Sequence, residues 1–430
     1  MVWPFHRVAR PTMPAASSSV DASVNRLVNR FIGGIVIGIA LAGCQTVAPP
    51  APAPAPPPSV PAPAPPAAAP RPVFVPGTWA DLPGWTTDPV AAAWPAFVIG
   101  CRALLANPNT QGLWQAPCMA GERLDGKDSA AVRVFFQDHF SPYRVTAADG
   151  VDKGLVTGYY EPLLAGSRTS TPEFAAPLYG PPDDLLTIDI ALLYPELKDK
   201  RVRGRIEGRK VVPYWPRAEL ERNPASLAGK ALVYVADPVE AFYLEIQGSG
   251  RIALTDGSVI RLNYADQNGH PYRSIGRVLI DRGELPLERA SMQGISAWAR
   301  ANPEKLRALL DENPSYVFFR EVAAPEPGSL DALIDGPLGT LGVPLLAQRT
   351  IAVDPRSIPL GAPVFLATTL PLSSTPLTRL TLAQDTGGAI RGTVRADYFW
   401  GFGPEAGREA GRMRQDGRMW LLWPKGAPLP

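Results

Sequence analysis

The feature that most restricts how this chain can fold is a proline-rich stretch near its amino terminus. Residues 49–76 consist largely of Ala-Pro and Pro-Pro repeats, and they hold much of the excess among the 50 prolines of the 430-residue chain. Proline lacks a backbone N–H and fixes φ, so such a run cannot build a core and favours an extended polyproline II conformation. The stretch therefore predicts a spacer between a short amino-terminal segment and a folded part.

The segment before the spacer has the pattern of an export signal. Two basic residues, Arg26 and Arg30, precede an apolar run over residues 31–42. That run is shorter than the roughly 20 apolar residues that span a bilayer, but it suits a signal peptide. It ends in Leu-Ala-Gly-Cys44, which matches the lipobox of bacterial lipoprotein precursors. We expect residues 1–43 to be a signal peptide and Cys44 to carry a lipid, the alternative being an ordinary signal peptide with a chance cysteine.

A lipid anchor followed by a stiff spacer would hold the folded part near a membrane while letting it reach outward. Polyproline II extends by about 3.1 Å per residue, so the spacer would reach far from the bilayer surface. Gln45, rather than an aspartate, follows the cysteine and favours the outer membrane. We therefore predict a periplasmic protein, lipid-anchored to the outer membrane, in which residues 44–76 are the lipidated cysteine and the linker.

The composition disfavours several other classes of protein. The net charge is only +2, so no broad basic surface for nucleic acid is indicated. The three histidines and three cysteines show no clustered metal-ligand spacing, and neither a metal nor another cofactor is predicted. The same scarcity disfavours a Ser-His-Asp or Cys-His enzyme. After Cys44 only Cys101 and Cys118 remain, which predicts either a disulfide in an oxidising compartment or two buried free thiols.

The folded part is predicted to mix helices with many short strands. Apolar spacings of three and four predict helices over residues 85–105, 128–139, 274–282, 287–302 and 303–313. Runs rich in β-branched and aromatic residues predict strands over 154–162, 230–236, 241–247, 350–353, 363–367 and 379–383, with a hairpin over 251–262. The middle of the chain is therefore expected to be a purely β subdomain.

One acidic residue, Asp385, is placed as a catalytic group would be. It follows the apolar strand 380–384 and precedes Gly387 and Gly388. A strand end holds a side chain rigidly, while the glycines allow close approach of a ligand and could expose amide donors. A carboxyl group held against apolar walls has a raised pKa, as a general acid near neutral pH requires. The alternative is an aspartate that only caps a turn or a helix.

Two other aspartates, Asp354 and Asp397, lie in the same part of the chain. Each could form a turn or an ion pair with its neighbour Arg356 or Arg395. Because glycoside hydrolysis generally uses two carboxyl groups, a pair among the three aspartates could also form a glycosidase site. The aromatic residues 398–400 could stack on sugars, although at least two of them are expected in the core.

Seven stretches together resemble the membrane-bound lytic transglycosylase A family of cell-wall enzymes, and their order and spacing are those of the family. They are residues 157–162, 233–250, 268–276, 313–319, 337–345, 352–361 and 383–392. The resemblance implies a mainly β fold with helices, in which a double-psi β-barrel domain with packing helices is interrupted by a second, smaller β-barrel domain. The implied boundaries are residues 77–157 plus 268–430 for the first domain and 158–267 for the second, with a groove between them for the glycan.

The resemblance also implies roles for particular residues. The single catalytic acid of the family corresponds to Asp385, with Asp397, Asp354 and Thr157 as candidate supporting residues. The implied glycan-binding residues are Tyr159, Tyr160, Gln247, Ser249, Gly250, Gly387 and Gly388. The implied partners are peptidoglycan glycan strands, the membrane through the lipid anchor, and cell-wall synthesis or hydrolysis complexes.

The implied reaction is cleavage of the β-1,4 bond between N-acetylmuramic acid and N-acetylglucosamine by a lytic exotransglycosylase. Asp385 would protonate the glycosidic oxygen and then, as a carboxylate, accept the proton of the C6 hydroxyl that attacks C1. The product would carry a 1,6-anhydro end. Two alternatives stay open, an inverting hydrolase that uses Asp385 and Asp397 with a water molecule, and a non-catalytic peptidoglycan-binding lipoprotein.

Overall fold

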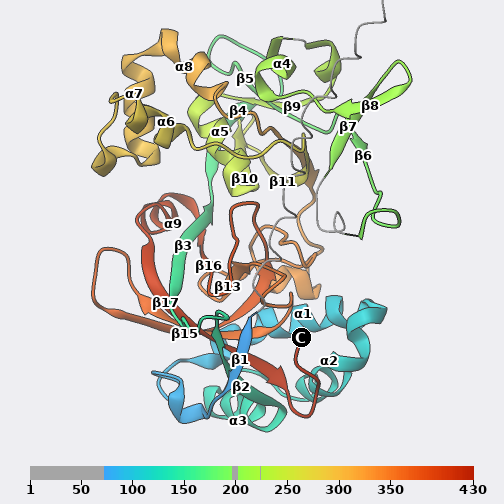
Figure 1. Cartoon of the computed structure of the whole chain (residues 1–430), viewed down its shortest axis with the longest axis vertical. Coiled ribbons are helices and arrows are strands. Elements are labelled where there is room, and N and C mark those ends of the chain that lie inside the picture. The colour runs from blue at the N-terminus through green and yellow to red at the C-terminus, as the bar shows by residue number, and fades with distance from the viewer. Residues whose placement is uncertain (1–71, 196–201, 223) are drawn as a thin grey trace, which may run out of the picture. The chain divides into compact units, whose positions relative to one another are not determined.

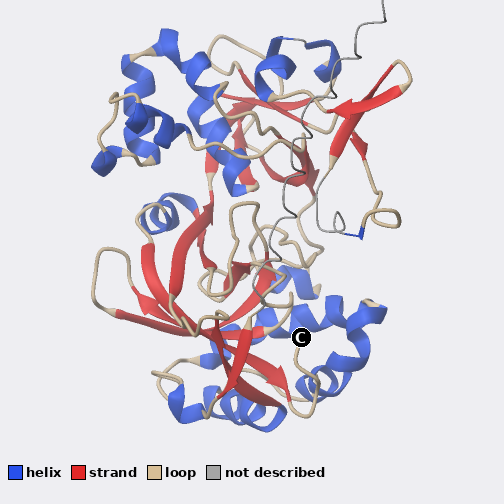
Figure 2. Cartoon of the chain, in the orientation of Figure 1, coloured by secondary structure: helices blue, strands red, loops and turns tan. Residues whose placement is uncertain are grey.

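The computed structural model describes residues 72–195, 202–222 and 224–430, whose helices and strands are drawn in Figures 1 and 2. The predicted signal peptide, the lipidated Cys44 and the spacer up to residue 71 lie outside the described residues. Across the part that is described, no helix has the length and apolar character needed to cross a membrane.

Six described strands of the largest sheet close into a barrel. The sheet has the order β1-β2-β17-β14-β15-β13-β16-β3, and a further pairing of β17 with β3 closes the ring. The barrel strands are β3 (Gly154–Glu161), β13 (Thr350–Val353), β14 (Pro363–Thr369), β15 (Pro376–Asp385), β16 (Ala396–Phe402) and β17 (Arg414–Pro424). The pairs β13–β15 and β16–β3 are parallel. The other pairs of the ring are antiparallel, so the barrel is mixed.

Three helices from the amino-terminal half of the chain contribute to the same hydrophobic core as the barrel strands. They are α1 (Trp94–Ala106), α2 (Pro108–Gly121) and α3 (Ser129–His139). Trp85 packs edge to face against Phe136 of α3 and Phe365 of β14, with ring centroids 6.5 and 5.6 Å apart. Burial of such large rings contributes much of the free energy that holds helices to a sheet. The helix predicted over residues 128–139 is confirmed, and Asp128 caps it by accepting a hydrogen bond from the Ala130 N–H.

Two boundaries predicted near the amino terminus are wrong. The spacer was expected to run to residue 76, but Val73–Pro76 form β1, which pairs with β2 (Phe140–Thr146) while Phe74 packs on the barrel core. The helix expected from residue 85 begins only at Trp94. Asp88 is instead drawn toward the barrel, where its carboxylate accepts hydrogen bonds from Arg349 at 2.9 Å and from a backbone N–H of β15.

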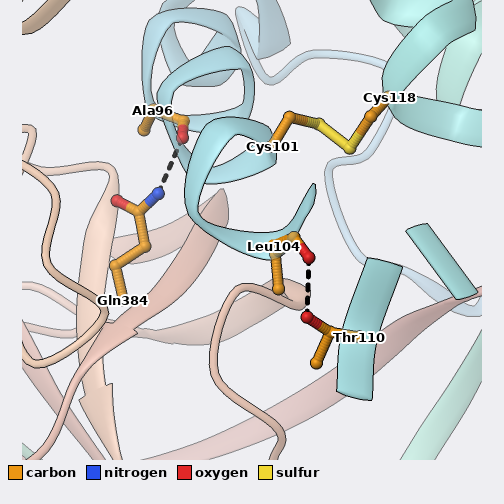
Figure 3. Close-up of a disulfide and its surroundings, with 6 residues drawn as sticks. All are labelled: Ala96, Cys101, Leu104, Thr110, Cys118 and Gln384. Atoms are coloured by element: carbon orange, nitrogen blue, oxygen red, sulfur yellow. Dashed lines mark hydrogen bonds between the residues drawn. A yellow bond between two sulfur atoms is a disulfide. The ribbon is translucent and has the colours of Figure 1, made fainter. Parts of the chain in front are cut away.

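A disulfide joins Cys101 of α1 to Cys118 of α2, with Cα atoms 5.6 Å apart (Figure 3). It confirms the disulfide rather than the pair of free thiols. One turn earlier on α1, the carbonyl oxygen of Ala96 accepts a 2.6 Å hydrogen bond from the side-chain amide of Gln384 (Figure 3). Gln384 is fully buried at the end of β15. The helix that the disulfide anchors therefore supports the strand end from which Asp385 projects.

Removing this disulfide is expected to destabilise the folded chain. Replacing Cys101 and Cys118 by alanine should lower the free energy of unfolding by about 2–4 kcal/mol, because the bond closes a loop with a sequence separation of 17. Denaturant unfolding of the full chain in detergent measures the difference, and the intact chain under reducing conditions serves as the control. Equal midpoints for the oxidised intact chain and the double variant would show that the disulfide contributes nothing.

A second sheet of six described strands has the order β12-β11-β10-β4-β9-β5. The strands are β4 (Leu163–Ser167), β5 (Ala176–Tyr179), β9 (Ala231–Val235), β10 (Ser249–Leu254), β11 (Val259–Gln267) and β12 (Val317–Val322). A small sheet beside it contains β6 (Leu186–Thr187), β7 (Arg203–Glu207) and β8 (Lys210–Pro213). The edge strands β12 and β5 contact each other. The sheet is therefore curled so that its two edges approach each other. Among the described residues, however, no strand pairing joins β12 to β5, so the sheet does not close into a barrel.

This second domain is not purely β, as Figure 2 shows. Residues 241–247, expected as a strand, belong to helix α5 (Pro238–Gln247). Asp237 caps that helix by accepting a 2.7 Å hydrogen bond from the Val239 N–H, and Pro238 occupies its first turn. Such an Asp-Pro start favours a helix and outweighs the aromatic and β-branched content that suggested a strand.

The second domain also extends past residue 267, its predicted end. Its edge strand β12 comes from residues 317–322. Helix α5 shares a core with three later helices. These are α6 (Ile275–Asp281), α7 (Met292–Ala301) and α8 (Pro303–Leu310), which Figure 1 shows grouped together, while the short α4 (Arg217–Arg222) lies elsewhere in the domain. The predicted helices 274–282 and 303–313 are confirmed, whereas α7 starts at residue 292 because Ser291 caps it there.

Candidate active site

Four neighbouring strands bring Asp385, Asp397 and Thr157 into one row. Ala352 on β13 pairs with Asp385 on β15 at one side and with Asp397 on β16 at the other. Asp397 in turn pairs with Thr157 on β3. Residues paired across strands direct their side chains to the same face of a sheet, and neighbouring strands lie about 4.8 Å apart. The two aspartates therefore share one face with their Cα atoms about two strand spacings apart, and the small Ala352 leaves room between them.

Asp385 is half-buried, and both of its carboxylate oxygens accept hydrogen bonds. Its Oδ1 accepts from the backbone N–H and from the hydroxyl of Thr340, both at 2.9 Å. Its Oδ2 accepts from the hydroxyl of Tyr159 at 3.0 Å. Burial raises the pKa of the Asp385 carboxyl, and the hydrogen bonds from Thr340, Thr386 and Tyr159 oppose that rise without cancelling it. A carboxyl group that is fixed in place and holds its proton more tightly than usual is suited to general acid catalysis.

Asp397 is held by a short chain of hydrogen bonds. Its Oδ1 accepts a 2.5 Å hydrogen bond from the hydroxyl of Thr157, which itself accepts one from Arg395 at 2.8 Å. Burial, opposed by Thr157 and Arg395 and reinforced by the charge of Asp385, raises the pKa of Asp397 to about 6. The two carboxyl groups therefore interact, and their ionisation steps belong to the pair. Such a pair can keep one proton near neutral pH.

An apolar layer lies beneath the two carboxyl groups. The ring of Tyr159 packs against Phe399 with centroids 5.1 Å apart, and both belong to a buried cluster with Leu345, Ala352 and Ile390. Burial and the neighbouring aspartates raise the pKa of Tyr159 well above its usual value, so its hydroxyl stays a hydrogen-bond donor. The layer accounts for the desolvation of both acids.

Asp354, the third aspartate, lies apart from this row and has a structural environment. Its carboxylate accepts hydrogen bonds from the Arg356 guanidinium at 2.9 and 2.7 Å and from the Gly392 N–H at 2.9 Å. Burial alone would raise the pKa of Asp354, but these bonds prevail and lower it. Both roles considered for Asp354 are therefore present, since it pairs with the Arg356 guanidinium and also accepts from the Arg356 N–H in a turn. Asp354 ties the end of β13 to the loop that follows Asp385.

The sequence matches two family descriptions, "MltA specific insert domain" over residues 155–320 and "3D domain" over residues 349–423. Membrane-bound lytic murein transglycosylase A of Escherichia coli (strain K12) is 35% identical over 318 residues, which span 70% of this chain and 73% of that relative. The chain belongs to the membrane-bound lytic murein transglycosylase A family. Membership in this family, abbreviated MltA, confirms the expected enzyme class, a lytic transglycosylase.

Solved MltA structures agree with the fold. MltA from Neisseria gonorrhoeae, in its monoclinic crystal form, has a TM-score of 0.72 and 39% identity, covering 83% of this chain and 94% of that chain. The lytic transglycosylase LtgG of Burkholderia pseudomallei has a TM-score of 0.55 and 47% identity, covering 82% and 96%. Escherichia coli MltA has been solved with bound chitohexaose, at a TM-score of 0.56 and 27% identity, covering 84% and 93%. These likenesses confirm the predicted fold class, a double-psi β-barrel fold with helices.

In this MltA member, the predicted glycan-binding residues Tyr159 and Tyr160 lie on opposite sides of β3. Tyr159 reaches Asp385, whereas the hydroxyl of Tyr160 contacts the sulfur of Met292 and its backbone N–H donates to Gln247 at 3.1 Å. Tyr160 and Gln247 line a separate cavity of 260 Å³ between α5, α7 and α9 (Gly403–Ala410). The structure therefore does not bring Tyr160 and Gln247 to the carboxyl pair of Asp385 and Asp397.

The remaining predicted binding residues are divided between β10 and the loop after Asp385. Ser249 and Gly250 are buried in β10, and a Cβ at position 250 would lie 2.3 Å from a methyl carbon of Leu244, which would have to shift. Gly387 and Gly388 follow Asp385 directly, and Gly388 is exposed with open space around its Cα. Of this set, only Tyr159 has a hydrogen bond to Asp385 among the described contacts.

Thr340 was not among the residues predicted from the sequence, although it donates two hydrogen bonds to Asp385. Thr340 lies 45 residues before Asp385, in a segment without regular structure, and its position depends on the whole fold. The only available signal was its place within the family-like stretch 337–345. Arg395 was considered a direct partner of Asp397, but its hydrogen bond goes to the Thr157 hydroxyl between them.

Replacing Thr340 by valine is expected to move the alkaline limb of the pH profile of kcat/KM to higher pH. Valine keeps the shape and the backbone N–H but removes the hydroxyl that stabilises ionised Asp385, so the pKa of Asp385 rises. The looser carboxyl should also lower kcat by about tenfold. Thr340→Ser, which keeps a hydroxyl, is the matched control and should retain the original profile. An unshifted limb in the valine variant would exclude this role for the hydroxyl.

Proposed function

We propose that this lytic transglycosylase cleaves the β-1,4 bond between N-acetylmuramic acid and N-acetylglucosamine in peptidoglycan, as an exotransglycosylase that leaves 1,6-anhydromuramoyl ends. The observation that supports it best is the carboxyl pair, with Asp385 fixed by Thr340 and Tyr159 and its pKa raised by burial. The bound chitohexaose of the Escherichia coli relative supports a β-1,4-linked glycan as the ligand class.

In the first step, protonated Asp385 donates its proton to the glycosidic oxygen as the bond from that oxygen to C1 of the muramoyl residue breaks. The leaving sugar departs with a neutral hydroxyl, and positive charge develops at C1. Asp397, held as a carboxylate by Thr157, lies on the same face of the sheet and would stabilise that charge. The hydrogen bonds to Asp385 persist through the step and favour the carboxylate it becomes.

In the second step, the Asp385 carboxylate accepts the proton of the C6 hydroxyl of the same muramoyl residue. The C6 oxygen forms its bond to C1, which closes the 1,6-anhydro ring and returns Asp385 to its protonated form. Because the attacking hydroxyl is already attached to the same sugar residue, little entropy is lost in bringing it to C1. One carboxyl group therefore serves as acid and then as base, and no water enters the product.

The glycan strand is proposed to run along a groove between the barrel and the second domain, with the sheet of β10 forming one side. Ser249, Gly250 and the loop with Gly387 and Gly388 remain the candidate contacts there. The division into a barrel domain and an insert is retained, with the end of the insert moved to residue 322 to include β12.

The lipidation of Cys44, removal of residues 1–43 and anchoring to the outer membrane are also part of the proposal. The lipobox and the proline-rich spacer support them, as does the membrane-bound family, which places the chain in the cell envelope. Cell-wall synthesis or hydrolysis complexes are the proposed protein partners of an enzyme held in that position.

Product analysis tests the proposed reaction against the two alternatives. Intact peptidoglycan sacculi incubated with the full chain should release soluble fragments with 1,6-anhydromuramoyl ends, detected by mass spectrometry. Fragments with reducing ends would indicate the inverting hydrolase, with Asp397 activating water. Glycan binding without released fragments would indicate the non-catalytic binding protein.

A further inference from the structure

One short segment connects the second sheet to the carboxyl group of Asp385. Residues 335–340, here called the strap, follow the turn η6 (Leu330–Leu333) and precede the first strand of the returning barrel, β13. The strap has no regular secondary structure of its own apart from a single bridge between Leu338 and Pro344. Two backbone hydrogen bonds to the segment that follows also hold it, from the Leu345 N–H to the Pro337 carbonyl oxygen at 2.9 Å and from the Gly339 N–H to the Val343 carbonyl oxygen at 3.0 Å. Its position relative to the second sheet depends on the side chains that bind it.

The start of the strap is held by two arginines of the second sheet. Arg251 of β10 donates to the Asp335 carboxylate at 3.0 and 3.1 Å, and Arg261 of β11 donates to the same group. Arg251 also donates to buried Glu161 at the end of β3, at 2.9 and 3.0 Å, and its guanidinium lies 4.0 Å from the ring centroid of Phe402. Charge-assisted hydrogen bonds of this kind fix the positions of the groups that they join. The Arg251 guanidinium therefore holds both the end of β3, at Glu161, and the start of the strap, at Asp335.

The middle of the strap is held by Asn263 of β11. The side-chain amide of Asn263 donates to the Leu338 carbonyl oxygen at 2.7 Å, and its oxygen accepts from the Leu338 N–H at 3.3 Å. Asn263 is only 6% exposed, so water cannot easily replace either bond. On β10, the residue paired with Asn263 is Ser249, the candidate glycan contact.

The end of the strap reaches the catalytic carboxyl group. Thr340, two residues after Leu338, donates two hydrogen bonds to Asp385 Oδ1, and its hydroxyl also lies 3.0 Å from the Thr386 hydroxyl. The next N–H, that of Leu341, donates to the carbonyl oxygen of Gln384 at 3.0 Å. Gly339 lies so close to β15 that a Cβ there would be 2.6 Å from the same carbonyl oxygen. A displacement of Leu338 would therefore be transmitted to Thr340 over a distance of two residues.

We propose that Asn263 is a positioning residue for the reaction: by holding Leu338, it keeps Thr340 in hydrogen-bond contact with Asp385. This inference rests on the proposed function of Asp385 as the catalytic acid. The other groups that face Asp385 are Tyr159 from β3 and Asp397 from β16, with Arg395 behind Thr157. Like Thr386, which follows Asp385 directly and also donates to it, they belong to the barrel and have no described hydrogen bond to Asn263. The second sheet, on which a glycan is proposed to bind, is thereby linked to the acid itself.

The test is the pH dependence of kcat and kcat/KM of the full chain in detergent, measured on sacculi. Asn263→Ala should lower kcat by about tenfold, with a smaller change in KM, because Thr340 no longer holds Asp385 firmly. The alkaline limb of kcat/KM should also move to higher pH, in the direction expected for Thr340→Val. Asn263→Asp, which has the same shape but presents an oxygen to the Leu338 carbonyl, should give the same shift if the alanine variant folds poorly.

Asn268→Ala is the matched control. Asn268 is likewise buried in the second domain, and its amide donates to the carbonyl oxygens of Trp215 and Pro314 rather than to the strap. Its removal should reduce stability by a similar amount and leave the alkaline limb in place. A limb that does not move in Asn263→Ala, or that moves equally in Asn268→Ala, would overturn the inference.

The failure of this inference can be told apart from the failure of the proposed function. One outcome is that Asp385→Asn abolishes activity while Asn263→Ala leaves the alkaline limb of the pH profile of kcat/KM where it is in the intact chain. In that case Asp385 keeps its role, and only the positioning role of Asn263 is rejected. If Asp385→Asn retains full activity, the acid has been assigned wrongly, and the positioning role is rejected with it.

Discussion

Asparagine in place of Asp385 is expected to lower kcat for release of fragments from sacculi by at least about 10³-fold. The side chain loses both the proton that it donates and the basic oxygen that it offers in the second step, while its size hardly changes. Its amide oxygen can still accept from Thr340, so the loop keeps its position. KM is therefore expected to stay within a few-fold of the intact value, since mainly interactions of the transition state are lost.

The matched measurement is binding of the same variant to sacculi. Asp385→Asn should sediment with sacculi as well as the intact chain does, and its thermal unfolding should show a folded protein. Burial disfavours the charged form of Asp385, so the uncharged amide is not expected to destabilise the fold at neutral pH. Activity within about tenfold of the intact chain would be incompatible with a single catalytic carboxyl group.

Asp397→Asn has the second largest expected effect, a loss of about 10²-fold in kcat. The substitution removes the negative charge that faces C1 in the proposed transition state but leaves Asp385 in place. In the intact chain this carboxyl must be ionised, and its pKa is about 6, so kcat/KM should fall as the pH drops through that value. The variant should lack this acidic limb. Thr157→Val, which removes the hydrogen bond but keeps the charge, is the control and should lose much less activity.

Although Asp397→Asn is expected to lower activity, it is expected to raise the free energy of unfolding. The pKa of Asp397 is raised from 3.8 to about 6 in the folded chain, so between these values the folded state binds more protons than the unfolded state. The free energy of unfolding therefore falls as the pH rises through this range. Relative to the intact chain, Asp397→Asn should gain about 1–2 kcal/mol between pH about 4 and about 8, measured by denaturant unfolding. A variant that loses relative stability over this range would contradict the environment described for Asp397.

Local signals in the sequence were sufficient for many of the elements. Periodic apolar residues located α3, α6 and α8, and the strand that ends at Asp385 was expected where β15 ends. These predictions rest on residues close together in the sequence, and such residues also determine helix caps and the ends of strands. The failures at β1 and α5 are local too. A Val-Phe-Val run was assigned to the spacer because prolines flank it, and an Asp-Pro cap was overlooked beside aromatic residues.

The site itself could be predicted only in part, because its geometry depends on strand pairing over long distances. Thr157 and Asp397 are 240 residues apart in the sequence and pair directly. The interpretation of Asp385 as an acid came from its strand end and from the family resemblance, not from its partners. Thr340 and Asn263 carry no local signal, since each acts through a contact with a residue that is 45 or 75 positions away in the sequence. Asp354 was grouped with the other two aspartates, although an adjacent arginine gives it a structural environment.

The central claim, that one carboxyl group performs both steps without water, is tested most directly by product analysis in ¹⁸O-labelled water. Sacculi are incubated with the full chain and with Asp385→Asn, and the released fragments are examined by mass spectrometry. The intact chain should give 1,6-anhydromuramoyl ends free of ¹⁸O, and the variant should give none. Reducing ends that carry ¹⁸O, or anhydro ends produced equally by Asp385→Asn, would contradict it.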